Sequence, residues 1–205
     1  MMTLLYPTYF PNIASYIVMV QSDVCVFEIC DSYQKQTYRN RCYIYGANGK
    51  LSLNIPVHFT QKNRQNTDEI EIENASKWLS IHWKSIESAY KTSPFFEFYE
   101  DEFKVLFENQ KDFLLDFNLE CIAVINSCLG FEPKISFSDQ FSKTSLRTDY
   151  RFLVNARKEP LIETDPYIQV FQEKHGSITN LSILDLLFNE GPNALSYLKN
   201  HSLTF

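Results

Sequence analysis

The first 29 residues constrain the fold more than any other part of the chain, because they predict a strand, a helix and a second strand in immediate succession. Residues 2–6 form a short apolar run that ends at Pro7, which is typical of a buried strand. Apolar side chains then recur at helical spacing over residues 13–20, and residues 24–29 are rich in β-branched and aromatic side chains. The connection of about seventeen residues suits a right-handed crossover, so the two strands are predicted to be parallel neighbours.

The middle of the chain predicts antiparallel strands. Residues 42–45 and 51–57 flank Gly46-Ala47-Asn48-Gly49, which indicates a hairpin with a four-residue loop. Residues 69–73 alternate Glu and Ile, the pattern of a half-buried strand with an acidic outer face. The residues between these two regions, 58–68, are polar and irregular, so we expect a loop there.

Helical patterns dominate the second half of the chain. Gly130 is expected to end one helix, and Asn180 is expected to cap another near the C-terminus. The predicted helices cover residues 76–91, 99–112, 113–129, 166–175, 181–188 and 193–199, with a strand over 134–137 and a long polar loop over 138–160. Together these elements predict an α/β fold: a single domain over residues 1–205, a mixed sheet with an N-terminal strand–helix–strand unit, and a mostly helical C-terminal half.

Composition and charge exclude several kinds of function. The chain has 205 residues and a net charge of −6, so no nucleic-acid partner is expected, because such binding requires phosphate neutralisation. With five glycines and neither GxGxxG nor GxxxxGKS, the chain has no sign of a glycine-rich phosphate cradle. His58, His175 and His201 are not spaced as metal ligands, so no metal site is predicted, and no pattern identifies a cofactor.

The sequence also predicts a cytoplasmic protein that does not span a membrane. Its five cysteines form no CxxC pair, which is typical of free thiols in a reducing compartment. The N-terminal residues lack the basic region of a signal peptide, and no apolar run approaches the roughly 20 residues that span a bilayer. Exposed aromatic side chains, in a chain with 17 Phe and 12 Tyr, could serve a homodimer interface.

A basic and aromatic segment over residues 33–43 is the strongest candidate for binding an anionic or sugar-like ligand. Lys35, Arg39 and Arg41 are interleaved there with three tyrosines, in a chain that is otherwise acidic. If the segment is extended, the two arginines share one face and could hold a diphosphate or carboxylate together with Lys35, because guanidinium groups bind such anions bidentately. Asn40, a further candidate for substrate binding, would face the opposite side. The alternative is a solvated or salt-bridged strand face.

His82 is the best candidate for acid–base catalysis. Histidine is the side chain whose ordinary pKa lies near neutral pH, and this one lies mid-helix with Lys84 and Glu87 nearby. The alternative is a histidine at the edge of the core, bonded to a backbone carbonyl.

Residues that follow the first two predicted strands would lie together at the carboxyl edge of the sheet, where ligands of open α/β sheets bind. Tyr9 and Asn12 follow the first strand and are candidates for the lining of a pocket. Asp31 follows the second strand and is a candidate catalytic carboxylate at the same rim. The alternative for the first pair is aromatic packing around a turn with two prolines. No serine or cysteine lies in a nucleophile elbow, so covalent catalysis is not expected.

Short blocks of residues, spread over most of the first two thirds of the chain, form a recognisable set. They are Tyr6–Pro11, Ser22-Asp23-Val24, Lys35 with Tyr38-Arg39-Asn40-Arg41, Asn54–Val57, Trp78 with His82, Tyr90, Pro94–Phe96, and the helix end at Leu129-Gly130. This set resembles the WbqC-like protein family from the N-terminus to about residue 131, with a weaker correspondence at Leu181–Asp185.

The resemblance implies a bacterial role in making cell-surface polysaccharides, because the family is associated with gene clusters of that kind. It also implies transferase activity on activated sugars or acyl groups. Two departures from the family pattern concern the chemistry. Ile29-Cys30-Asp31 stands where members commonly have an acidic pair, and residues 187–192 replace a glycine-rich motif after Asp185-Leu186.

These observations support two hypotheses. The first is a transferase of bacterial cell-surface polysaccharide (O-antigen-type) biosynthesis, which binds an anionic activated sugar or acyl donor through Lys35, Arg39 and Arg41, with His82 as general base. The second, which the two departures favour, is a non-catalytic binding or scaffold protein that retains the fold.

Overall fold

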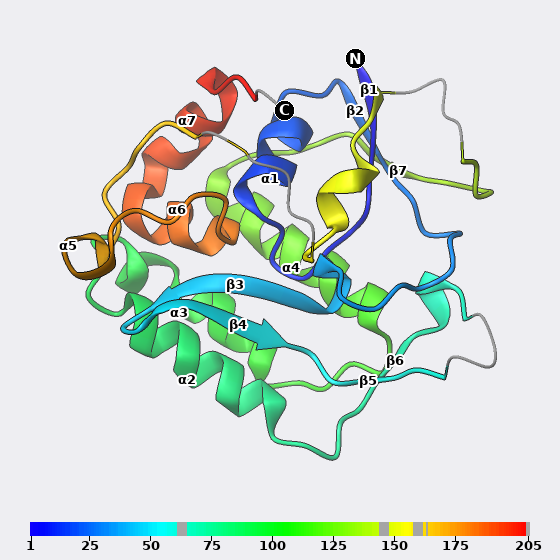
Figure 1. Cartoon of the computed structure of the whole chain (residues 1–205), viewed down its shortest axis with the longest axis horizontal. Helices are drawn as coiled ribbons and strands as arrows, with labels where there is room; N and C mark the ends of the chain where they lie inside the picture. Colours follow the sequence, from blue (N-terminus) through cyan, green and yellow to red (C-terminus); the bar gives the residue numbers. More distant parts are fainter. Residues whose placement is uncertain (61–64, 144–147, 158–161, 163, 204–205) are drawn as a thin grey trace.

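A parallel sheet is built around the N-terminal strand–helix–strand unit (Figure 1). The computed structural model describes residues 1–60, 65–143, 148–157, 162 and 164–203. Strand β1 (Met2–Leu5) pairs in parallel with β2 (Val24–Phe27), and helix α1 (Ile13–Val20) lies in the crossover between them. Strands β7 (Ile135–Phe137) and β8 (Thr148–Asp149) add in parallel at the two sides, which gives the strand order β7-β2-β1-β8. The predicted parallel pair and its helix are confirmed.

The antiparallel pairs form two separate ribbons. Strands β3 (Arg41–Gly46) and β4 (Gly49–Asn54) form the predicted hairpin, but Gly46 pairs with Gly49, so the loop has two residues where four were predicted. Gly49 has a φ of 99°, which glycine adopts without a steric penalty and thereby permits the tighter turn. A shorter ribbon joins β5 (Val57–His58) to β6 (Glu71–Ile72).

Helices pack beside the hairpin and are the main elements of the second half of the chain (Figure 1). Helices α2 (Trp78–Tyr90) and α6 (Ile183–Glu190) both contact β3. The other helices are α3 (Phe96–Lys104), α4 (Leu114–Leu129), α5 (Gln172–His175) and α7 (Ala194–Asn200). Short 3-10 turns lie at Tyr38–Asn40, Thr67–Glu69, Val105–Phe107, Arg151–Val154 and Gly191–Asn193.

The predicted helix boundaries have mixed outcomes. Gly130 follows α4 with a φ of 61°, the left-handed conformation expected of a residue that ends a helix. The expectation for Asn180 is wrong, because the hydroxyl of Ser182 caps α6 by accepting from the amide of Leu184. The side chain of Asn180 instead accepts from the amide of Ala14 at 3.0 Å, which ties the C-terminal region to the start of α1.

One hydrophobic cluster extends from Leu5 to Leu198, so the N-terminal unit and the C-terminal helices share a core. Much of it is aromatic: the ring of Phe103 lies 5.3 Å from that of Phe188 and 6.0 Å from that of Phe10. The predicted α/β class with a single core is confirmed, with the parallel and antiparallel pairings in different sheets. Among the described side chains that are less than 2% exposed, the largest is a cation, Arg39.

Candidate functional site

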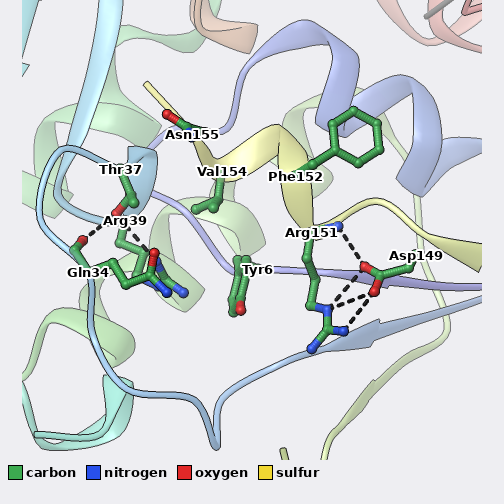
Figure 2. Close-up of a pocket in the computed structure, with 9 residues that line it drawn as sticks. All are labelled: Tyr6, Gln34, Thr37, Arg39, Asp149, Arg151, Phe152, Val154 and Asn155. Atoms are coloured by element: carbon green, nitrogen blue, oxygen red, sulfur yellow. Dashed lines mark hydrogen bonds and ion pairs between the residues drawn. The ribbon is translucent and has the colours of Figure 1, made fainter. Parts of the chain in front are cut away.

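Polar residues meet at the carboxyl edge of the parallel sheet. Tyr6 follows the last residue of β1, Glu28 follows β2, Ser138 follows β7, and Asp149 is the last residue of β8. Because all four strands run in the same direction, these residues emerge at one edge. A cavity of about 590 Å³ opens there, within the range of small-molecule sites. It is lined by Tyr6, Gln34, Thr37, Arg39, Asp149, Arg151, Phe152, Val154 and Asn155 (Figure 2).

Arg39 is held on one side of this cavity by a carboxylate and an aromatic ring. The 3-10 turn that precedes β3 directs its side chain inward, where it is 1% exposed. One terminal nitrogen donates to Asp31 at 2.5 Å, and the other carboxylate oxygen of Asp31 accepts from the hydroxyl of Thr67 at 2.6 Å. The guanidinium carbon lies 3.9 Å from the centre of the Tyr6 ring. Stacking and ion pairing together fix the plane of the guanidinium.

The donors of Arg39 are only partly used. Besides the bond to Asp31, its second terminal nitrogen is 3.4 Å from the hydroxyl of Thr37, which is a weak hydrogen bond. Its Nε is buried and has no partner among the described residues. A guanidinium carries five N–H donors and two are used here, so three have no partner among the described residues. A buried donor without a partner destabilises the protein, and a ligand that accepts from it relieves that cost.

Arg151, which also lines the cavity, is paired with two carboxylates. It donates to Asp149 at 2.7 Å and to Glu28 at 3.3 Å. Glu28 is itself buried and accepts from the hydroxyl of Ser138 at 2.7 Å and from the amide of Cys30 at 2.9 Å. Two arginines therefore face three carboxylates at this edge, those of Asp31, Glu28 and Asp149. The site is polar and ion-paired, with no excess of positive charge.

Tyr6 lies between the two arginines (Figure 2). Burial, and next the nearby carboxylate of Asp31, raise the pKa of Tyr6 well above its ordinary value, although Arg39 and Arg151 act in the opposite direction. Its phenol consequently stays protonated at neutral pH. Tyr6 can therefore donate or accept a hydrogen bond, but it is not a base under those conditions.

Two other hollows have different chemistry. One of about 940 Å³ lies between α4 and β7, where Glu132 is the charged residue of a mostly apolar lining. Another of about 480 Å³ lies between the β3–β4 hairpin and α2. Neither contains a buried ion pair, so the cavity with Arg39 has the convergent polar groups that are typical of a binding site.

His82 and Tyr9 contact each other away from this cavity. The hydroxyl of Tyr9 is 2.9 Å from Nδ1 of His82, and both side chains are buried, against the rings of Trp78 and Phe117. Burial lowers the pKa of His82 to about 4, and a hydrogen bond with the backbone of Asn54 opposes that shift. His82 is thus neutral at pH 7. Its buried position agrees with the alternative given for it above, a histidine of the core, and not with a general base.

The other predicted binding residues lie apart from the cavity lining. Arg39 and Arg41 were expected to share a face if the segment is extended, but Arg39 belongs to a 3-10 turn and Arg41 begins β3. Asn40 donates to the carbonyl of Ile55 at 2.9 Å. Lys35 is exposed, with its Nζ 5.0 Å from the ring of Phe59. Asn12 caps α1 by accepting from the amide of Ser15 at 2.9 Å.

Most of the cavity lining was missed by the sequence analysis, which named Arg39 alone of these nine residues as a site candidate. Five of the others fall within residues 138–160, where a loop was predicted, although β8 and a 3-10 turn lie there: Asp149, Arg151, Phe152, Val154 and Asn155. One signal was available, since Arg151 directly precedes an apolar run, Phe-Leu-Val, in a segment that is otherwise polar. An arginine beside such a run is a candidate for a buried, paired cation.

The described part of the chain gives two further results. None of its helices combines the length and apolar character needed to cross a bilayer. No group of three or more His, Cys, Asp or Glu within that part is arranged to hold a metal ion.

Fold and site together define an α/β protein with a polar, ion-paired cavity at the carboxyl edge of a parallel sheet. The chain belongs to the WbqC-like protein family, whose sequence profile matches residues 6–160. The match includes all the residues that line the cavity, and it extends past residue 131, where the resemblance was expected to end.

Among individual proteins, the chain is similar to "Uncharacterized protein Rv1507c" of Mycobacterium tuberculosis. The two sequences are 25% identical over 194 residues, which covers 82% of this chain and 84% of the relative. No solved structure matches the chain significantly.

Proposed function

We propose that the chain binds an activated sugar or acyl donor in the cavity at the carboxyl edge of the sheet, and that it acts as a transferase in bacterial cell-surface polysaccharide biosynthesis. The observation that carries the proposal is the state of Arg39, which lines the cavity, is 1% exposed and keeps an unpartnered Nε. Phosphate or carboxylate oxygens of such a donor supply the acceptors that Arg39 lacks.

Preorganisation supports this role for Arg39. Asp31 and the ring of Tyr6 fix the guanidinium before a ligand arrives, so little side-chain freedom is lost on binding. In the proposal, Asp31 is a positioning residue, because its carboxylate already accepts from Arg39 and Thr67. The link to polysaccharides rests on the associations of the WbqC-like family, to which the chain belongs.

The test is a ligand panel of UDP-glucose, dTDP-glucose, GDP-mannose and acetyl-CoA, scored by melting temperature and by calorimetric titration. At least one donor should stabilise the wild-type protein. Arg39→Lys, which keeps the charge but loses the planar fork, should weaken its binding at least about tenfold. Phe152→Ala removes a 46% exposed ring from the cavity lining and should weaken binding without unfolding the protein.

Phe98→Ala is the matched control, because Phe98 is 77% exposed and lies on α3, outside the lining of the cavity. It should bind as the wild type does. The proposal fails if no donor stabilises the wild type, or if Arg39→Lys binds the donor as tightly as the wild type.

A non-catalytic binding protein is the second candidate, and the burial of His82 favours it. With His82 in the core and Asp31 engaged by Arg39, neither predicted catalytic group lies free in the cavity. Release of the nucleotide or coenzyme A from a bound donor, followed by chromatography, separates the two functions. Product that forms with the wild type and not with Arg39→Lys supports the transferase; tight binding without product supports the binding protein.

A further inference from the structure

The cavity has a second side, built from β8 and the 3-10 turn that follows it. Asp149 and Phe152 belong to this side, and both line the cavity together with Arg39 (Figure 2). The side chain of Asp149 is 35% exposed, and the ring of Phe152 is 46% exposed. Arg39 and Arg151, the other charged residues of the lining, are buried, whereas the carboxylate of Asp149 and the ring of Phe152 are accessible.

Asp149 keeps part of its capacity to accept hydrogen bonds. Its Oδ1 accepts from the amide and from Nε of Arg151, both at 3.0 Å, and its Oδ2 accepts from the same Nε at 3.1 Å and from a terminal nitrogen of Arg151 at 2.7 Å. The single Nε proton is shared between the two oxygens, so Arg151 supplies three N–H groups. A carboxylate has about four acceptor positions, and its 35% exposed side chain can therefore accept about one more hydrogen bond. Burial alone would raise the pKa of Asp149, but the hydrogen bonds from Arg151 outweigh it and lower that pKa, so the carboxylate is charged.

Phe152 gives this side an apolar surface. Its neighbour Val154 also lines the cavity, whereas Gln34, Thr37 and Asn155 place polar groups around the same space. A pyranose ring has the matching character, because its C–H groups form an apolar face and its hydroxyls lie around the edge. Sites of this kind combine aromatic surface with a few placed polar groups.

The charges of the site favour a ligand with a single anionic group. Among the described residues that line the cavity, Arg151 is neutralised by Asp149 and Glu28, which leaves Arg39, itself paired with Asp31, as the cation with unused donors. A pyrophosphate placed wholly inside the cavity would face these carboxylates without a second available cation among those lining residues, and like charges at short range repel.

We infer that the cavity binds a hexose ring with one anionic substituent: the ring lies on Phe152, one hydroxyl donates to Asp149, and the anion contacts Arg39. The inference rests on the proposed function, whose cavity and anion contact it shares, and it assigns the sugar of the donor to that cavity. Asp149 then determines which sugar is accepted, because a site that hydrogen-bonds a ring hydroxyl binds an analogue without that hydroxyl much more weakly.

The experiment measures the binding of glucose 1-phosphate, galactose 1-phosphate and mannose 1-phosphate by saturation-transfer NMR and calorimetry. Each is compared with analogues that lack one ring hydroxyl. The wild type should bind one of these sugars, and one of its deoxy analogues should bind roughly tenfold more weakly, as the loss of a hydrogen bond to a charged group predicts. Asp149→Asn should reduce that ratio to about threefold or less, because an amide is a weaker acceptor than a carboxylate.

A merely structural role of Asp149 would lower the affinity for a sugar and for its analogue equally, and the ratio would not change. That result overturns the inference. Asp139→Asn, at an exposed aspartate outside the cavity lining, is the matched control and should keep the wild-type ratio. If Asp149→Asn does not fold, Phe152→Ala decides instead: it should weaken the sugar phosphates while leaving the binding of inorganic phosphate unchanged, and equal loss of both overturns the inference.

The outcomes separate this inference from the proposed function. If a nucleotide sugar or acyl donor binds and no hexose phosphate does, the inference is overturned while the proposed function stands. If hexose phosphates bind with the expected dependence on Asp149 but no donor is converted, the inference stands and the transferase is excluded.

Discussion

The hydroxyl of Tyr9 lies 2.9 Å from Nδ1 of His82, and this contact joins the segment after β1 to the middle of α2. Both side chains are almost fully buried, at 0% and 4% exposure. Within that environment a charged imidazolium would have to lose its hydration, so burial lowers the pKa of His82 to about 4. The pair therefore stabilises the core in its neutral form.

This arrangement makes the stability of the protein depend on pH. An unfolded histidine titrates near pH 6.5 and His82 near pH 4, so the unfolded state takes up the proton first as pH falls. Its contribution to stability is present above pH 6.5 and is lost progressively towards pH 4. Between pH 7 and pH 4.5 the wild type should lose about 2–3 kcal/mol from this group alone, measured by urea unfolding at each pH.

His82→Gln provides the comparison, because glutamine can bond to Tyr9 but does not titrate. Its free energy of unfolding should fall less than that of the wild type over the same pH interval, whatever its stability at pH 7. An equal decrease in both proteins would mean that His82 is accessible and titrates normally, which would return it to consideration as a general base.

Arg39 and Asp31 should be strongly coupled. Their side chains are 1% and 3% exposed, so removing either partner leaves a buried charge. Arg39→Ala and Asp31→Ala should each lower the free energy of unfolding by about 3–5 kcal/mol, and the double variant should lose much less than the sum. Urea unfolding of the four proteins gives the coupling energy. Additive losses would show that the two charges do not interact.

Asn12 should act as a helix cap and not as a ligand contact. Its side chain accepts from the amide of Ser15, so Asn12→Ala should destabilise the protein by about 1 kcal/mol, whereas Asn12→Ser should retain most of the cap. Thermal unfolding measures both. Donor affinity should be unchanged in Asn12→Ser; a large loss of affinity in that stable variant would assign Asn12 to the binding site after all.

The N-terminal half of the fold could be predicted because its signals are local. Helical spacing over residues 13–20 and short apolar runs on either side are enough to place β1, α1 and β2. Their direction then locates the carboxyl edge, where the cavity lies. By contrast, β8 has only two residues, too few for an alternating pattern to be recognised.

The composition of the site could be predicted only in part, because its pairings are long-range. Arg151 and Glu28 are 123 positions apart, and nothing in either local sequence indicates the other. The basic segment made Arg39 a candidate for ligand binding. Arg39 lies within the 3-10 turn Tyr38–Asn40, however, whereas Arg41 is the first residue of β3. Glu28 and Asp31 lie on either side of Ile29-Cys30, and each of these buried carboxylates pairs with a different arginine, which their local sequence does not indicate.

The variant Lys35→Ala tests whether Lys35 and Arg39 bind the same anion. Its ammonium is exposed and contacts the ring of Phe59 at 5.0 Å, whereas Arg39 is buried in the cavity wall. Lys35→Ala should therefore change the free energy of unfolding by less than about 1 kcal/mol and donor affinity by less than about twofold. Arg39→Lys, measured in the same titration, should lose affinity at least about tenfold. If Lys35→Ala loses as much as Arg39→Lys, the anion spans both side chains, and the single-anion cavity is wrong.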